Sequence, residues 1–183
     1  HDDLQVNSRA AYLGRYVLAA TLSSNIGIYG PAYELMDFEP YPGKEEYNHS
    51  EKYELKQWDW DKQGNLKGEI ARINAIRNNH PALQRTFNLF FADSDNPHFL
   101  CYLKQNWDCS DQILVVVNMD WEHTQSGFIN LPLEHLGLGE HDGFTVRDLY
   151  DPYEAEYTWQ GARNFIKINP HVRPAHIFKI RRL

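Results

Sequence analysis

The side chains best able to bind a metal or to attack a substrate, histidine and cysteine, are scattered along the chain. The nine histidines show no tight metal-ligand spacing, whereas a zinc site needs three or four converging ligands. Cys101 and Cys109 have no paired histidine motif and make no disulfide scaffold, so we expect one thiol in a buried strand and one in a loop. No glycine-rich phosphate loop is present. The sequence therefore predicts neither a metal site nor a cofactor.

A stronger chemical pattern is the run SEKYE at residues 50–54, inside a segment rich in aromatic side chains. The ammonium of Lys52 carries three donors for hydroxyl oxygens, and the ring of Tyr53 joins an apolar face to a polar tip. The same run also fits a solvated, charged turn. Trp58 and Trp60 follow, and they suit either stacking on sugar rings or packing in the interior and between domains.

Charge and composition exclude several classes of protein. Of the 183 residues, 14% are aromatic, and so many large rings can bury enough surface to exclude a disordered chain. The formal charge of −7 is repelled by a phosphate backbone, which argues against a nucleic-acid partner. No apolar run approaches the roughly 20 residues that span a bilayer, and no signal-peptide pattern is present. We therefore expect a cytoplasmic globular protein without a membrane partner.

Two segments of the first half have helical patterns. Residues 8–24 are apolar on nearly every side, which is typical of a buried helix, and Ser8 or Asn7 can accept a free N–H of its first turn. Residues 65–79 repeat leucine and isoleucine at spacings of three and four. Pro81 ends this second helix.

The stretch between the two helices is irregular. Residues 25–30 form a short apolar run bounded by glycine and proline, which predicts a brief buried strand. Residues 31–64 show no period, and a loop of that length is unusual unless it has a function. Glu34, just after the predicted strand, either lines the rim of a site or bonds backbone N–H groups; we favour the structural role.

From about residue 82 the helical pattern gives way to short apolar runs separated by turn signals. Many short strands at close spacing indicate an antiparallel β-sandwich. A domain boundary is therefore predicted between residues 1–81 and 82–183. The predicted strands are 87–91, 99–103, 113–117, 127–129, 144–149, 157–159, 165–168 and 176–180.

Several of these motifs resemble a known family. Residues 26–30 followed by Glu34 look like the eighth barrel strand of the α-amylase family, where a Tyr-Gly pair precedes a Glu. Four further stretches narrow the resemblance to the α-1,4-glucan:maltose-1-phosphate maltosyltransferases, a bacterial branch of that family. These stretches are residues 18–23, residues 50–56, residues 115–120 with 123–127, and residues 157–159 with Asn164 and 174–178.

The resemblance covers essentially the whole chain, and it implies an α+β fragment of a longer protein. Residues 1–81 would be the last helices and strand of a catalytic (β/α)8 barrel, which is incomplete here. Residues 82–183 would be an all-β C-terminal sandwich. A start at His1 without a methionine fits this expectation.

The resemblance also implies an activity and site residues. The family transfers maltosyl units from α-maltose 1-phosphate to α-1,4-glucan, releases phosphate and retains the anomeric configuration. Retention needs a nucleophile and an acid/base carboxyl about 5–5.5 Å apart, and the family takes both from earlier barrel strands. Asp2 matches the third carboxylate, which stabilises the transition state, and the adjacent Asp3 leaves the register open. Lys52 and Tyr53 match a pair that contacts donor hydroxyls. Because the nucleophile and the acid/base carboxyl would come from barrel strands that this sequence lacks, this chain alone is expected to be inactive.

Two other functions fit the residues. An α-amylase-type glycoside hydrolase shares the same domains, although residues 50–56 and 157–178 favour the transferase. A carbohydrate-binding β-sandwich would hold glucan without chemistry, whereas the alternative role of the sandwich is to shield the barrel and pack against its last helix. Without barrel neighbours, the apolar helix at 8–24 would favour self-association, which makes a homodimer the expected oligomer. The stacking platforms of a glucan-binding sandwich would be Trp107, Trp121 and Trp159.

Overall fold

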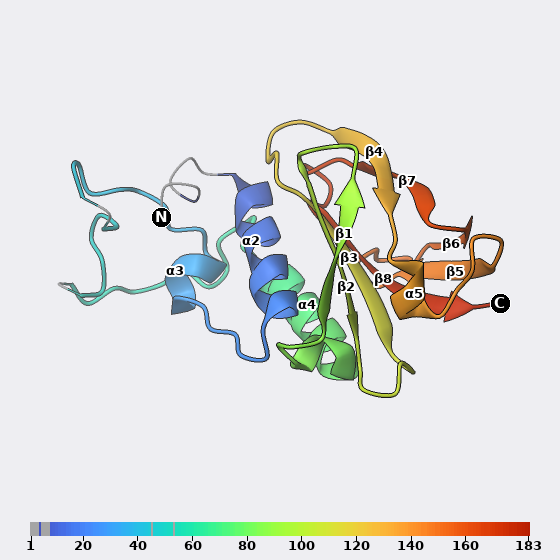
Figure 1. Cartoon of the computed structure of the whole chain (residues 1–183). Helices are drawn as coiled ribbons and strands as arrows, with labels where there is room; N and C mark the ends of the chain where they lie inside the picture. Colours follow the sequence, from blue (N-terminus) through green and yellow to red (C-terminus); the bar gives the residue numbers. More distant parts are fainter. Residues whose placement is uncertain (1–3, 5–7, 45, 53) are drawn as a thin grey trace.

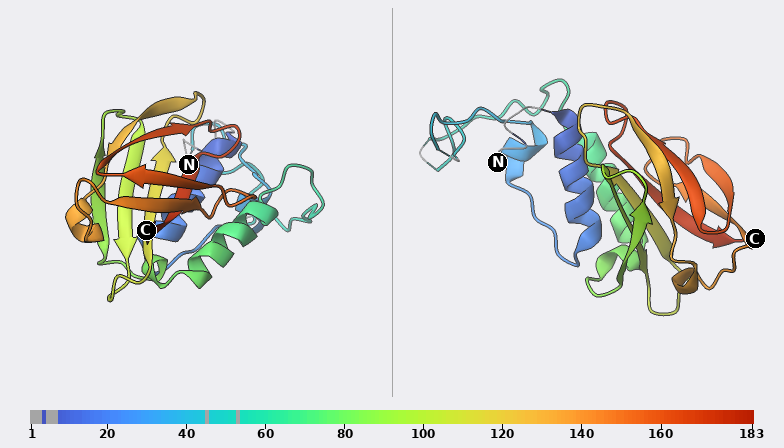
Figure 2. Two further views of the ribbon diagram at one scale, coloured as in Figure 1. Left: turned by 90° about the vertical axis from the view of Figure 1, so that its right-hand side faces the viewer. Right: turned by 45° about the horizontal axis from the view of Figure 1, so that its top comes forward.

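The structure, a computed structural model, describes residues 4, 8–44, 46–52 and 54–183. Three layers follow one another across the molecule: a loop-rich layer, a helical layer and a β-sheet (Figure 1). A second direction of view shows the same order (Figure 2). The helices are α2 (Arg9–Leu22), α3 (Gly30–Glu34), α4 (Lys67–Asn79), the 3-10 helix η1 (Pro81–Gln84) and α5 (Leu133–Leu136).

Both predicted helices are confirmed. The Oγ atom of Ser8 accepts a hydrogen bond from the Ala11 N–H at 3.3 Å, which caps α2. Most of α2 is buried within the chain, against α4, the sheet and the segment after it. The apolar surface that we expected to drive self-association is therefore covered. None of the helices in the described residues has the length and apolar character needed to cross a bilayer.

The strand predicted at residues 25–30 is wrong. Residues 25–29 belong to no helix or strand, and α3 begins at Gly30. A strand is stable when neighbouring strands pair its backbone N–H and C=O groups, and none of the described strands pairs with this run. The described part of residues 1–81 therefore contains no strand of a barrel.

The described strands form one eight-stranded sheet in the order β6-β5-β8-β3-β2-β1-β4-β7, with all pairs antiparallel. β1 pairs with β2 over residues 89–92 and then with β4 at residues 93–94, where the sheet passes from one side of its core to the other. The strands are β1 (Leu89–Ser94), β2 (Phe99–Gln105), β3 (Gln112–Asn118), β4 (Gln125–Asn130), β5 (Gly143–Asp148), β6 (Glu156–Gln160), β7 (Arg163–Ile168) and β8 (Ala175–Arg182).

The all-β character of the C-terminal part is confirmed, but its arrangement differs from two separate sheets. The end strands β6 and β7 follow each other in the chain, so one sheet folds round until it is nearly closed. The switch of β1 between two partners links what would otherwise be the two halves of a sandwich. This long-range pairing leaves no periodic signal in the sequence.

β3 lies at the centre of the sheet and is buried along its whole length. Its side chains alternate between two hydrophobic cores. Val115 packs with α2 and α4 in the first core, and Val116 packs inside the folded sheet in the second. A strand covered on both faces reads as a continuous apolar run, which is why residues 113–117 were recognisable as a strand.

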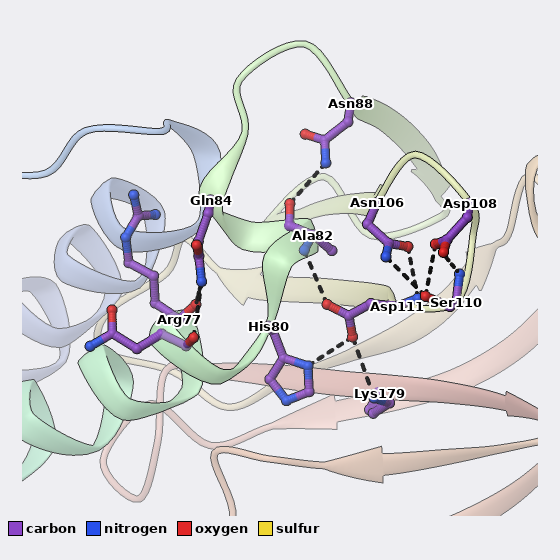
Figure 3. Close-up of polar contacts among 11 residues, drawn as sticks. Arg77, His80, Ala82, Gln84, Asn88, Asn106, Asp108, Ser110, Asp111 and Lys179 are labelled. Atoms are coloured by element: carbon purple, nitrogen blue, oxygen red, sulfur yellow. Dashed lines mark hydrogen bonds and ion pairs between the residues drawn. The ribbon is translucent and has the colours of Figure 1, made fainter.

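A buried carboxylate ties the helical layer to the sheet (Figure 3). Asp111 accepts hydrogen bonds from His80 Nδ1 at 2.8 Å and from the Ala82 N–H at 3.0 Å, and Lys179 Nζ lies 3.4 Å away. Burial acts to raise the pKa of Asp111, but the hydrogen bonds from His80 and Ala82 and the charges of His80 and Lys179 outweigh burial. The net result is a pKa of Asp111 below the ordinary value for aspartate, so the folded protein stabilises the ionised carboxylate.

Candidate functional site

The loop between α3 and α4, residues 35–66, carries the predicted substrate-contacting lysine, and its two ends are held together. The Leu66 N–H donates to the backbone carbonyl of Glu34 at 2.7 Å, and Lys62 Nζ donates to the Leu35 carbonyl at 2.7 Å. These two contacts fix where the loop leaves α3 and where it joins α4. Glu34 thus closes the loop through its backbone, in agreement with a structural role.

Tyrosines fasten this loop to α2. The Tyr33 hydroxyl donates to the backbone carbonyl of Tyr12, and the two rings meet edge to face at 5.0 Å. Tyr29, just before α3, and Tyr47 of the loop stack with ring centroids 6.5 Å apart, and the Tyr12 hydroxyl of α2 donates to the Asp37 carbonyl of the loop at 3.5 Å. Burial raises the pKa of Tyr12 and of Tyr33 well above the usual range for tyrosine. These rings are therefore neutral near pH 7 and act as anchors.

Trp58 is occupied by contacts inside the loop. Its Nε1 donates to Glu51 Oε1 at 2.7 Å, and the ammonium of Lys56 lies 4.6 Å from a ring centroid. Lys56 also forms an ion pair with Asp37. One face and the polar edge of the indole are thus in use, which favours packing over sugar stacking. Trp60 similarly lies beside the ammonium of Lys67, at the start of α4.

Lys52 lies on the outer surface of the loop. Its Nζ is 3.0 Å from Glu46 Oε1, and the two side chains are 60% and 36% exposed. An exposed ion pair of this kind contributes at most about 1 kcal/mol to stability. The two other predicted site residues, Asp2 and Tyr53, lie outside the described residues.

The three tryptophans of the β-rich part have different surroundings. Trp107 is 87% exposed in the turn between β2 and β3. The Trp121 ring packs against Gly14 of α2 and lies 5.8 Å from the Arg15 guanidinium carbon, so it joins sheet and helix. Trp159 of β6 lies in a cleft with other aromatic side chains. No single row of stacking platforms connects the three.

The thiols lie where the sequence predicts them, one buried in β2 and one exposed in a turn. Burial raises the pKa of Cys101 to about 12, which makes it an inert side chain of the core. Within residues 4, 8–44, 46–52 and 54–183, no three His, Cys, Asp or Glu side chains converge as metal ligands.

The cleft between β6, β7 and β8 was not among the features predicted from the sequence. Its lining includes Tyr157, Trp159, His176 and Phe178. The available signal was the spacing within two pairs, Tyr157 with Trp159 and His176 with Phe178. The members of each pair are two residues apart, which places them on one face of a strand. What the sequence does not reveal is that β6 and β8, which β7 separates in the chain and β5 separates in the sheet, bring both pairs to one place.

Comparison with known proteins relates the chain to one group of enzymes. Residues 91–180 match the family model described as "GLGE, C-terminal". The α-1,4-glucan:maltose-1-phosphate maltosyltransferase of Chlorobaculum tepidum is 48% identical over 98% of the chain, which covers 28% of that protein. The protein of the same name from Methylacidiphilum infernorum is 48% identical over 97% of the chain and is covered to 26%. The chain thus spans about a quarter of the length of these curated relatives.

The fold has a counterpart among solved structures. A noncanonic maltogenic α-amylase from Thermotoga neapolitana superposes with a TM-score of 0.64 over 97% of this chain and 38% of that one, at 13% identity. At that identity the likeness concerns the fold alone. The sequence relatives are the more specific finding, because they align along nearly the whole chain and share one name. The chain belongs to the α-1,4-glucan:maltose-1-phosphate maltosyltransferase family, and it matches the C-terminal part of its members.

Proposed function

We propose that this chain is part of a cytoplasmic retaining transferase that moves maltosyl units from α-maltose 1-phosphate to an α-1,4-glucan and releases phosphate. The observation that carries the proposal is the 48% identity, over 98% of the chain, to a relative of that name. In this proposal residues 1–81 complete a catalytic barrel and residues 82–183 form the accessory β-domain. The elongated product is a glycogen-like glucan.

The chemistry divides between this chain and the rest of the protein. A retaining transfer proceeds by two displacements at one carbon, with a carboxylate nucleophile and a second carboxyl that acts first as acid and then as base. We assign both to residues outside this chain, and we assign transition-state stabilisation to Asp2. Lys52 and Tyr53 would hold donor hydroxyls. The 183-residue chain alone is then inactive.

The geometry of the loop supports the role of Lys52. The loop is closed at Glu34 and Leu66, and its first residues are held to α2 through Tyr33 of α3 and through the Asp37 carbonyl. The exposed pair with Glu46 is weak enough to be exchanged for a hydroxyl. A lysine ammonium can donate to more than one hydroxyl of a donor sugar.

The test is phosphate release from α-maltose 1-phosphate in the presence of glycogen, with the full reading frame that encodes this chain. We expect phosphate together with longer glucan products. Lys52→Ala should lower kcat/KM roughly ten- to hundredfold, because a hydrogen bond from a charged donor is lost. The matched control is Lys44→Ala in the same loop, whose ammonium lies 4.8 Å from the ring of Tyr41, and it should leave the rate unchanged.

Three other outcomes of this test would contradict the proposal. Hydrolysis of malto-oligosaccharides without phosphate release would identify an amylase-type hydrolase. Glucan binding without either reaction would leave the carbohydrate-binding module. Transfer of maltosyl units by the purified 183-residue chain would contradict our assignment of the nucleophile and the acid/base to residues outside it.

A further inference from the structure

A cleft opens where the nearly closed sheet fails to pair with itself. β6 and β7 are the two end strands, and the cleft lies between them and β8, with a volume of about 220 Å³. One of the stretches that carry the family resemblance, residues 157–159 together with 174–178, supplies most of its lining. The lining residues are Tyr157, Trp159, Phe165, Ile166, Lys167, His176 and Phe178.

Aromatic rings make the floor and one wall of the cleft. The ring of Phe178 is almost fully buried and lies at the centre. The His176 ring stacks on it at 4.9 Å, and Trp159 and Tyr157 meet it edge to face at 5.4 and 6.4 Å. Tyr157 and Phe165 are 48% and 54% exposed, so the cleft is open to solvent at these two rings.

A polar edge faces these rings. His176 Nδ1 is 2.7 Å from Asp148 Oδ2, and the Asp148 carboxylate is buried and also accepts from the backbone N–H groups of Tyr150 and Ile177. This fixes the orientation of the imidazole. Its Nε2 lies 3.4 Å from the Lys167 carbonyl, at the long end of hydrogen-bond distances. A sugar hydroxyl carries one proton, so beside these two atoms it can donate to the Lys167 carbonyl while it accepts from a protonated Nε2, or donate to a bare Nε2 instead.

We infer that this cleft binds one glucosyl unit of an α-glucan chain. A pyranose ring has an apolar C–H face, which fits Tyr157 and Trp159, and a rim of hydroxyls, which fits His176 Nε2 and the Lys167 carbonyl. The cleft is smaller than the roughly 300–1,000 Å³ that encloses a drug-sized ligand, so one ring fits and a long chain does not. The choice of glucan as ligand rests on the proposed function. The shape and chemistry of the cleft do not depend on that function.

The experiment is an NMR titration of the labelled 183-residue chain with maltoheptaose, which carries no phosphate, into the millimolar range. We expect shifts at the Trp159 indole N–H and at the backbone amides of residues 157, 167 and 176. Tyr157→Ala should weaken binding about tenfold, as expected for the loss of one stacked ring. Trp107→Ala is the matched control, since that ring is exposed on a turn outside the cleft, and it should have no effect.

The inference is overturned if maltoheptaose moves none of the cleft signals, or if Tyr157→Ala and Trp107→Ala weaken binding equally. Equal binding of cellohexaose would overturn the choice of an α-glucan. If Tyr157→Ala does not fold, the titration of the unaltered chain still decides. Binding can be measured without turnover. If the full protein releases phosphate but maltoheptaose shifts none of the cleft signals, the glucan-binding inference is wrong and the proposed function stands. Cleft binding without phosphate release refutes the proposed function alone.

Discussion

Replacement of Arg77 should be among the most destabilising single changes in the helical layer. Arg77 is buried in α4, and its guanidinium donates to four backbone carbonyls. Three of these, from Ala20, Ser23 and Ser24, lie at the C-terminal end of α2, where carbonyls have no partner within the helix. The fourth belongs to Leu83 in η1. One side chain thus joins α4 to two other elements, and its charge also favours the negative end of the α2 dipole.

The expected loss can be worked from these contacts. Arg77→Met keeps most of the side-chain volume but removes every donor. The bonds to Ala20 and Leu83 are buried, at 2.6 and 2.7 Å, so water cannot replace them. A hydrogen bond to a charged group contributes about 1.5–3 kcal/mol, and two such bonds give about 3–6 kcal/mol. Burial, and after it the charge of Arg77, lowers the pKa of Lys104 to about 8. Relief of the repulsion between Arg77 and Lys104 offsets a small part of this loss, which leaves about 3–5 kcal/mol.

The assay is urea unfolding of the 183-residue chain followed by circular dichroism, with a thermal scan beside it. For a chain of this length, each kcal/mol shifts Tm by roughly 2–4 °C, so we expect a fall of about 6–20 °C. The Tm of Arg77→Lys should lie between those of the parent chain and Arg77→Met, because one ammonium cannot reach four carbonyls. Arg85→Met is the matched control on an exposed arginine and should change little. If Arg77→Met lowers the free energy of unfolding by less than about 1 kcal/mol, with the dependence of that free energy on urea concentration unchanged, the reasoning is refuted.

Two further predictions concern the contacts between sheet and helices. Asp111 has a lowered folded-state pKa, so its contribution to stability is present above about pH 4 and is lost as the pH falls through the folded value. Asp111→Asn should therefore be less stable than the parent at pH 7, with a gap that narrows in denaturant titrations below pH 4; a constant gap would contradict this. At Gly14 an added Cβ would overlap the Trp121 ring. Gly14→Ala should therefore lower Tm despite a gain of about 1 kcal/mol in helix propensity, and an unchanged Tm would argue against that close packing.

Elements with a strong local pattern could be predicted from the sequence. The helix at 65–79 was visible because Leu66, Ile70, Ile73 and Ile76 share one face, and all four are buried. The central strand was visible because residues 113–117 are apolar on both faces. The run at 25–30 has the composition of a strand, yet it needs a partner strand that the described residues do not supply. Composition alone cannot tell whether that partner exists.

The candidate site divides in the same way. Lys52 could be identified because its neighbours in sequence resemble a family motif. The packing of Trp58 depends on Lys56 and Glu51, which lie close in sequence, but only the fold of the loop brings them to its ring and its N–H. The cleft beside Phe178 needs β6 and β8 to lie near each other, and that proximity follows from the pairing of both with β5. Such contacts have no signature in a single strand.

The β-domain and the Lys52 loop are connected through α2. On one side the Thr21 hydroxyl lies 2.6 Å from the Tyr102 hydroxyl of β2, and on the other Tyr33 binds the backbone of Tyr12. Burial raises the pKa of Tyr102 as it does for Tyr12 and Tyr33, so every hydroxyl in this connection stays neutral across the physiological range. The sheet therefore orients the loop by contacts that do not titrate there. Any pH dependence of the proposed transfer between pH 5 and 8 would then not arise from titration of these tyrosine contacts.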